Sequence, residues 1–149
     1  MDAPVQISFP LPRSIDTRIY LHLTVKSKAI VLFLTTASLE DATSPSPLGS
    51  FVYALPDKYN PSQPLATALC TVEPTIEFTT RLAKLLARKT QRPVYVGNSI
   101  SLASTGLGGT VEEELDAFKR VVEVTLAQLR PVIEAQAAQT ASDGVRPGQ

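Results

Sequence analysis

The residues that could support catalysis are few in this chain of 149 residues. His22 is the only histidine, and a hydrolytic triad or a histidine-ligated metal site needs partner groups that the sequence does not obviously provide. We interpret His22 as a structural residue within a strand. Cys70 is the only cysteine and lies in an apolar segment without a basic neighbour to activate it, so we expect a buried, inert thiol. We therefore predict a protein that is not an enzyme, with no catalytic residues, no metal site and no cofactor.

A glycine-rich segment at residues 104–110 precedes a predicted helix, a position where phosphate groups often bind. The segment lacks the lysine of a P-loop and the spacing of a dinucleotide fingerprint. Glu112, Glu113 and Glu114 follow it and would repel a phosphate, so we favour a flexible linker before a capped, solvated helix start. A small nucleotide- or phosphate-binding enzyme that uses residues 106–110 remains the alternative.

The densest positive charge lies within residues 81–99, where a basic amphipathic helix passes into a short strand. Apolar residues at positions 78, 82, 85 and 86 recur at helical spacing and predict a stripe that faces a core. The basic residues Arg81, Lys84, Arg88, Lys89 and Arg92 occupy the other faces. A solvated surface explains this pattern, and so does a contact for an acidic protein partner. Nucleic-acid binding is disfavoured because the patch has no interleaved aromatic residues and the chain carries no net charge.

The composition predicts one folded domain and excludes strong attraction to nucleic acids or membranes. Fourteen basic and fourteen acidic residues cancel, although residues 1–107 carry ten basic and seven acidic side chains and residues 108–149 carry four and seven. No apolar run approaches the ~20 residues that cross a bilayer. The first residues do not have the pattern of a secretory signal, and a single cysteine favours a reducing compartment. We expect the cytosol or the nucleus.

The elements that must position these residues are mostly strands. Alternation or apolar runs predict strands over residues 5–9, 19–25, 29–35, 50–55, 65–72 and 94–100. Helices are expected over residues 74–90 and from Thr110 onward, and Pro131 should kink or end the second one. The prediction is a single domain over residues 1–135 and a disordered polar tail over residues 136–149.

The order βββββαβα with short links indicates an α+β fold, a mostly antiparallel sheet of five to six strands with two helices on one face. Within residues 30–34, both faces of the predicted strand are apolar, so both must be covered. Two helices cover only one face. The candidates on the other face are Tyr20, Val31, Phe33 and Tyr53, and a partner subunit is the simplest cover for them.

The run LAKLLARKT at residues 82–90 is followed by a polar-Pro step and by residues 94–96 with Asn98 after them. In these segments the sequence resembles the proteasome assembly chaperone 4 family. The strand over residues 30–34, the loop around Tyr59 and the closing helix follow in the same order, so the resemblance covers residues 15–130. The Pro- and Ser-rich loop at residues 43–48 and the polar tail depart from the family pattern.

The resemblance implies a non-catalytic chaperone that pairs with a related chaperone 3 subunit. The heterodimer would bind a proteasome α subunit, expected to be the fifth, and promote assembly of the α-ring of the 20S particle. The contact for the α subunit is assigned to Arg81, Lys84, Arg88 and Lys89, and the partner-chaperone interface to the apolar residues of the uncovered sheet face. A homodimeric scaffold unrelated to the proteasome is a second alternative.

Overall fold

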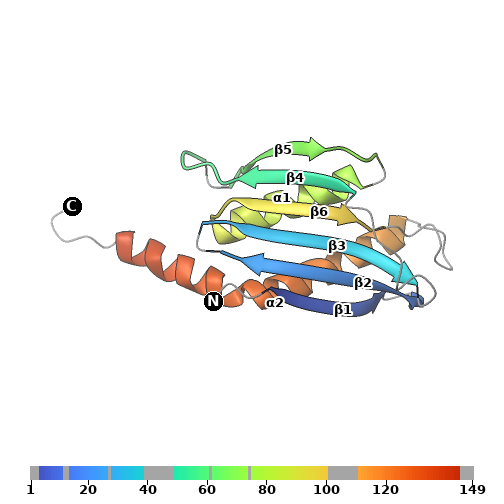
Figure 1. Cartoon of the computed structure of the whole chain (residues 1–149). Coiled ribbons are helices and arrows are strands. Elements are labelled where there is room, and N and C mark those ends of the chain that lie inside the picture. Colours follow the sequence, from blue (N-terminus) through green and yellow to red (C-terminus); the bar gives the residue numbers. More distant parts are fainter. Residues whose placement is uncertain are drawn as a thin grey trace.

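The computed structural model describes residues 4–11, 14–26, 28–38, 49–60, 62–73, 75–100 and 111–144. The elements follow the predicted order βββββαβα (Figure 1). They are β1 (Val5–Leu11), β2 (Ser14–Val25), β3 (Ile30–Ser38), β4 (Ser50–Leu55), β5 (Leu65–Cys70), α1 (Ile76–Thr90), β6 (Val94–Ser99) and α2 (Val111–Gly144).

The six strands form one sheet in the order β1-β2-β3-β6-β4-β5. Strand β6 pairs parallel with β3 and antiparallel with β4, and the remaining neighbours are antiparallel. Both helices lie behind the same face of the sheet, with α1 behind β4 and β6 and the first part of α2 behind β1 to β3 (Figure 1). The predicted α+β fold, mostly antiparallel with two helices on one face, is therefore confirmed. The insertion of β6 between β3 and β4 was not predicted.

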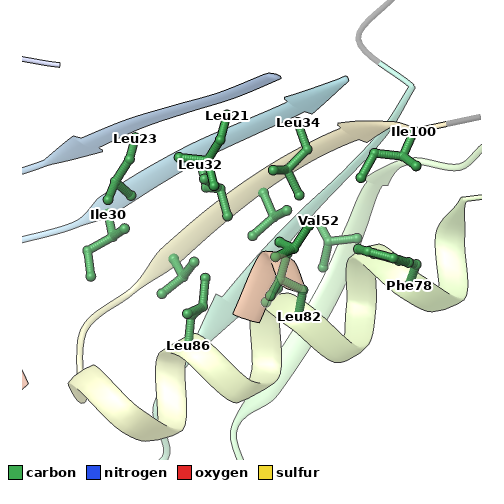
Figure 2. Close-up of a cluster of buried hydrophobic side chains, with 14 of the residues drawn as sticks. Leu21, Leu23, Ile30, Leu32, Leu34, Val52, Phe78, Leu82, Leu86 and Ile100 are labelled. Atoms are coloured by element: carbon green, nitrogen blue, oxygen red, sulfur yellow. The ribbon is translucent and has the colours of Figure 1, made fainter. Parts of the chain in front are cut away.

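The core lies between the sheet and the helices. Alternate residues of β2, β3, β4 and β6 are buried there, as strand periodicity requires. Figure 2 shows Leu82 and Leu86 of α1 pointing toward the sheet, where Leu32 and Val52 are buried. Burial of each such leucine contributes about 1.5–3 kcal/mol, so this layer supplies most of the driving force for folding.

Helix α1 ends through a left-handed residue, Gln91, two residues before Pro93. Gln91 has φ 53° and its backbone N–H donates to the Ala87 carbonyl at 2.8 Å. Arg92 then donates from Nη1 to the carbonyl of Lys26 at 3.0 Å, and Ile30 N–H donates to the Pro93 carbonyl at 2.9 Å. These bonds fix the end of α1 against the connection between β2 and β3.

Helix α2 is longer than predicted. A stripe at four-residue spacing is buried, formed by Ala117, Val121, Thr125 and Leu129. The helix does not end at Pro131, which lies on an exposed face, and the following Ala and Gln residues favour helix. It continues to Gly144, into the segment expected to be a disordered tail, and this last part extends away from the sheet (Figure 1). Neither helix is long and apolar enough to cross a membrane in the described chain.

Candidate protein-binding surfaces

The sheet face opposite the helices carries all four residues that were predicted for a partner interface. Tyr20 of β2, Val31 and Phe33 of β3, and Tyr53 of β4 each alternate with residues buried under the helices. We call this side the open face. It is covered by no element of the described chain (Figure 1). Its role in partner binding stays a prediction.

A row of aromatic rings crosses the open face over four strands. His22 meets the edge of Phe33, with ring centroids 6.5 Å apart, and Phe33 stacks on Phe51 at 6.2 Å. Phe51 stacks on Tyr95 at 6.0 Å, and Tyr95 lies 4.6 Å from Tyr53. These separations fall in the range of favourable aromatic pairs. The row is thus a pre-ordered apolar surface, in which each ring limits the motion of its neighbours.

Gly97 makes the middle of this row possible. It lies on β6 and is paired with Phe33 on one side and Phe51 on the other. Strands β3 and β4 are two strand spacings apart, about 9.5 Å, so side chains standing straight up would not stack. Because Gly97 has no side chain, the two rings lean over it and approach to 6.2 Å. Gly97 is itself buried.

A hollow of about 590 Å³ lies beside the aromatic row on the open face. Ser8 of β1, Tyr20 and His22 of β2, and Phe33 of β3 line it together with Gly97. Its walls are mostly apolar, with a few hydroxyl groups and one imidazole. In protein interfaces generally, the side chains that contribute most to binding fill well-packed pockets.

Sequence reasoning interpreted His22 only as a structural residue and missed two further members of the row, Phe51 and Tyr95. Both alternate with residues buried under the helices: Phe51 with Ser50 and Val52, and Tyr95 with Val94 and Val96. This period of two was visible in the sequence and could have placed both rings on the face opposite the core.

The four predicted α-subunit contacts, Arg81, Lys84, Arg88 and Lys89, are all exposed on α1. The described part of the chain offers none of them an ion pair. Three of them, Arg81, Lys84 and Arg88, line one hollow of about 580 Å³ between α1, Phe118 of α2 and the start of β5. Lys89 does not line it. Of the four predicted contact residues, three therefore share one hollow and Lys89 lies outside it.

The predictions for reactive groups need two corrections. Cys70 is exposed rather than buried, because it ends the edge strand β5, where no further strand covers it. Glu113 is buried at 1% exposure, so the acidic start of α2 is not wholly solvated, whereas Glu112 and Glu114 are exposed. His22 is half-buried within the aromatic row.

The proposed phosphate-binding segment at residues 106–110 lies outside the described residues. Over the ranges that the structure describes, no three His, Cys, Asp or Glu side chains gather in a way that would hold a metal ion. The geometry does build two surface features: the open face with its aromatic row, and the hollow lined by Arg81, Lys84 and Arg88. The class that this fold defines is a small α+β domain, with one six-stranded sheet and two helices in the described chain.

Comparison with known proteins identifies the family. The model of the proteasome assembly chaperone 4 family matches residues 18–100, more than half of the chain, so the chain belongs to this family. A solved structure described as a chaperone complex for yeast 20S proteasome assembly contains a similar chain. The two share a TM-score of 0.59 and 17% sequence identity over 87% of this chain and 98% of that one, which shows a common fold. A search of curated proteins found no match.

Proposed function

We propose that this protein is a non-catalytic chaperone that acts as one half of a heterodimer during assembly of the proteasome α-ring. One partner is a subunit related to chaperone 3, and the client is a proteasome α subunit, the fifth in this proposal. The chaperone works stoichiometrically in the cytosol or the nucleus: it holds one α subunit, blocks incorrect neighbours, and leaves before the particle matures.

The observation that carries the proposal is the open aromatic face. Rings from β2, β3, β4 and β6 form a continuous apolar row on a face that no element of the described chain covers. Large contiguous apolar patches are uncommon on monomers and mark protein interfaces. Membership of the family and the shared fold with a chain of a chaperone complex support a related subunit as the cover.

The basic side of α1 is assigned to the α subunit. It lies on the side of the molecule away from the open face, so one surface binds the partner chaperone while the other stays accessible to the client. Exposed cations steer an acidic protein toward the site more than they add to affinity.

Co-purification of the tagged chain from cells in mild salt, followed by mass spectrometry, tests the pairing. We expect a chaperone 3 relative and α-ring subunits among the recovered proteins. Recovery of neither would overturn the proposal. Phe33→Asp, which places a charge in the aromatic row, is expected to lose the chaperone relative.

Charge reversal tests the client contact separately. The triple variant with Arg81→Glu, Lys84→Glu and Arg88→Glu should recover fewer α subunits than the unchanged chain, and the remaining binding should depend less on salt. The chaperone relative should be recovered as before, because these side chains lie away from the open face. Normal binding of α subunits by the triple variant would show that this side of α1 is only a solvated surface.

A further inference from the structure

The hollow beside α1 has a chemical character that a charged helix surface alone would not have. Its rim is cationic and is formed by Arg81, Lys84 and Arg88, and its walls include the apolar side chains of Leu65, Leu85 and Phe118. We call it the basic groove. We propose that the basic groove binds an extended acidic segment of a partner protein, with one apolar side chain seated between two carboxylates. The inference deepens the client contact proposed above and rests on that proposal only for the identity of the partner.

The charge of the groove favours an acidic ligand. All three cations are exposed, and no described residue forms an ion pair with any of them. Glu77 lies one turn before Arg81 on α1, yet the two form no ion pair in the described structure. A carboxylate ligand would therefore gain new charge-assisted hydrogen bonds without breaking existing ones.

The walls of the groove favour an apolar side chain at the centre of that ligand. Leu65 is 61% exposed, unusually high for a leucine, and Leu85 is half-buried. Phe118 is held by an edge-to-face contact with Phe78, with centroids 5.0 Å apart and planes at 77°. A fixed ring beside an exposed leucine provides a ready site for one aliphatic or aromatic anchor.

Helix geometry sets the spacing of the ligand carboxylates. Arg81 and Arg88 are seven residues apart on α1, which corresponds to about 10.5 Å along the helix axis. An extended chain advances about 3.3 Å per residue and its side chains alternate between two sides, so residues four positions apart share one side and lie about 13 Å apart. The long side chains of Arg81 and Arg88 span the small remaining difference. The expected ligand thus has two acidic residues four positions apart, with a large apolar residue midway between them on the same side.

A dye-labelled peptide of this pattern is the probe, with two glutamates four positions apart and one leucine midway between them. Its binding to the full chain is measured by fluorescence anisotropy in low salt. Two control peptides are matched to it: one replaces both glutamates by glutamine, and the other replaces the leucine by serine. Both controls should bind more weakly than the probe.

Variants of the chain then locate the site. Arg81→Glu, Lys84→Glu and Arg88→Glu should each weaken binding about two- to fivefold, as expected for exposed ion pairs. Lys89→Glu makes the same change of charge on the same helix outside the groove, and it should leave binding within twofold. Leu65→Ser should weaken binding of the leucine peptide but not of the serine peptide.

Three results would overturn the inference. The first is an equal loss with Lys89→Glu, and the second is equal binding of the serine peptide; either would show that general charge attracts the probe. The third is a single-stranded oligonucleotide that competes for the groove more strongly than the acidic peptide. If α subunits co-purify while the peptide fails to bind, only this inference falls. If the peptide binds and no proteasome protein is recovered, the groove still binds acidic segments, and only the proposed function is overturned.

Discussion

Two single glycines lie where other parts of the chain approach β6 closely. Gly97 allows the rings of Phe33 and Phe51 to meet above it, and Gly49 allows the backbone to pass β6 just before β4 begins. At Gly49 a side chain is excluded for reasons of space, because a Cβ would meet the backbone of Asn98 and Ser99. Small residues at such points shape a binding surface as directly as the aromatic residues do.

Gly49 provides a test at this scale. Its φ is +73°, a conformation that residues with a Cβ rarely adopt, and a Cβ there would lie 2.1 Å from the Asn98 carbonyl oxygen. We expect Gly49→Ala to lower the free energy of unfolding by about 2 kcal/mol or more, combining backbone strain with a backbone clash. Urea denaturation followed by circular dichroism measures this change.

Lys58→Ala is the matched control, because Lys58 is exposed in the connection between β4 and β5. It should unfold at the same urea concentration as the unchanged chain. Equal midpoints for Gly49→Ala and Lys58→Ala would show that the chain avoids the clash at little energetic cost.

At the scale of elements, local patterns in the sequence predicted most of the strands and the faces on which their residues lie. Alternation around Tyr20 and Phe33 assigned their faces correctly, and the strand over residues 50–55 was predicted with its observed bounds. Such patterns succeed because burial on one face imposes a period of two on a strand. The start of β6 at Val94 was likewise visible from the proline before it.

Features that depend on pairing between distant strands were not predictable from these patterns. Gly97 lies between Phe33 and Phe51 only because β6 inserts between β3 and β4, and no local pattern encodes that order. The basic groove has the same origin, since it combines α1 with Phe118 and with residues before β5. The sequence identified its cations, but the apolar walls come from segments brought together by the tertiary fold.

The last part of α2 is expected to contribute little to the stability of the domain. Glu134 and Ala135 are exposed, and the helix beyond them extends away from the sheet (Figure 1). Removal of residues 136–149 should therefore change the melting temperature by less than about 2 °C, because little apolar surface is lost. Differential scanning calorimetry at a fixed protein concentration measures the change.

Leu129→Ala supplies the contrast within the same helix. Leu129 is fully buried, and its truncation should cost about 2–5 kcal/mol. A loss of comparable size on removal of residues 136–149 would show that the end of α2 packs against the domain and belongs to its core.

At the scale of the whole molecule, the fold separates two kinds of surface. The apolar open face lies on one side of the sheet, and the cationic side of α1 lies on the other. A protein that must hold a partner and a client at once benefits from this separation, because the two binding events do not compete for the same residues. The separation also allows each contact to be removed alone.

We therefore expect the partner chaperone to raise the melting temperature of this chain when it binds the open face. A partner that binds only the folded chain, present at 100 times its dissociation constant, stabilises it by about 2.7 kcal/mol. For a domain of this size, that gain corresponds to a rise in melting temperature of roughly 5–10 °C. Phe33→Asp should remove this rise, since Phe33 belongs to the aromatic row and is 38% exposed in the chain alone. The partner would bury the new carboxylate without a hydrogen-bonding group opposite it, which is costly.

The comparison uses thermal melting of the chain alone and with the purified chaperone 3 relative. Lys84→Asp introduces the same carboxylate on the exposed side of α1, and it should keep the full rise in melting temperature. A rise that survives Phe33→Asp, or that Lys84→Asp removes, would place the partner on the helix side instead. Because each variant is also melted alone, a defect in folding is measured directly and separated from a defect in pairing.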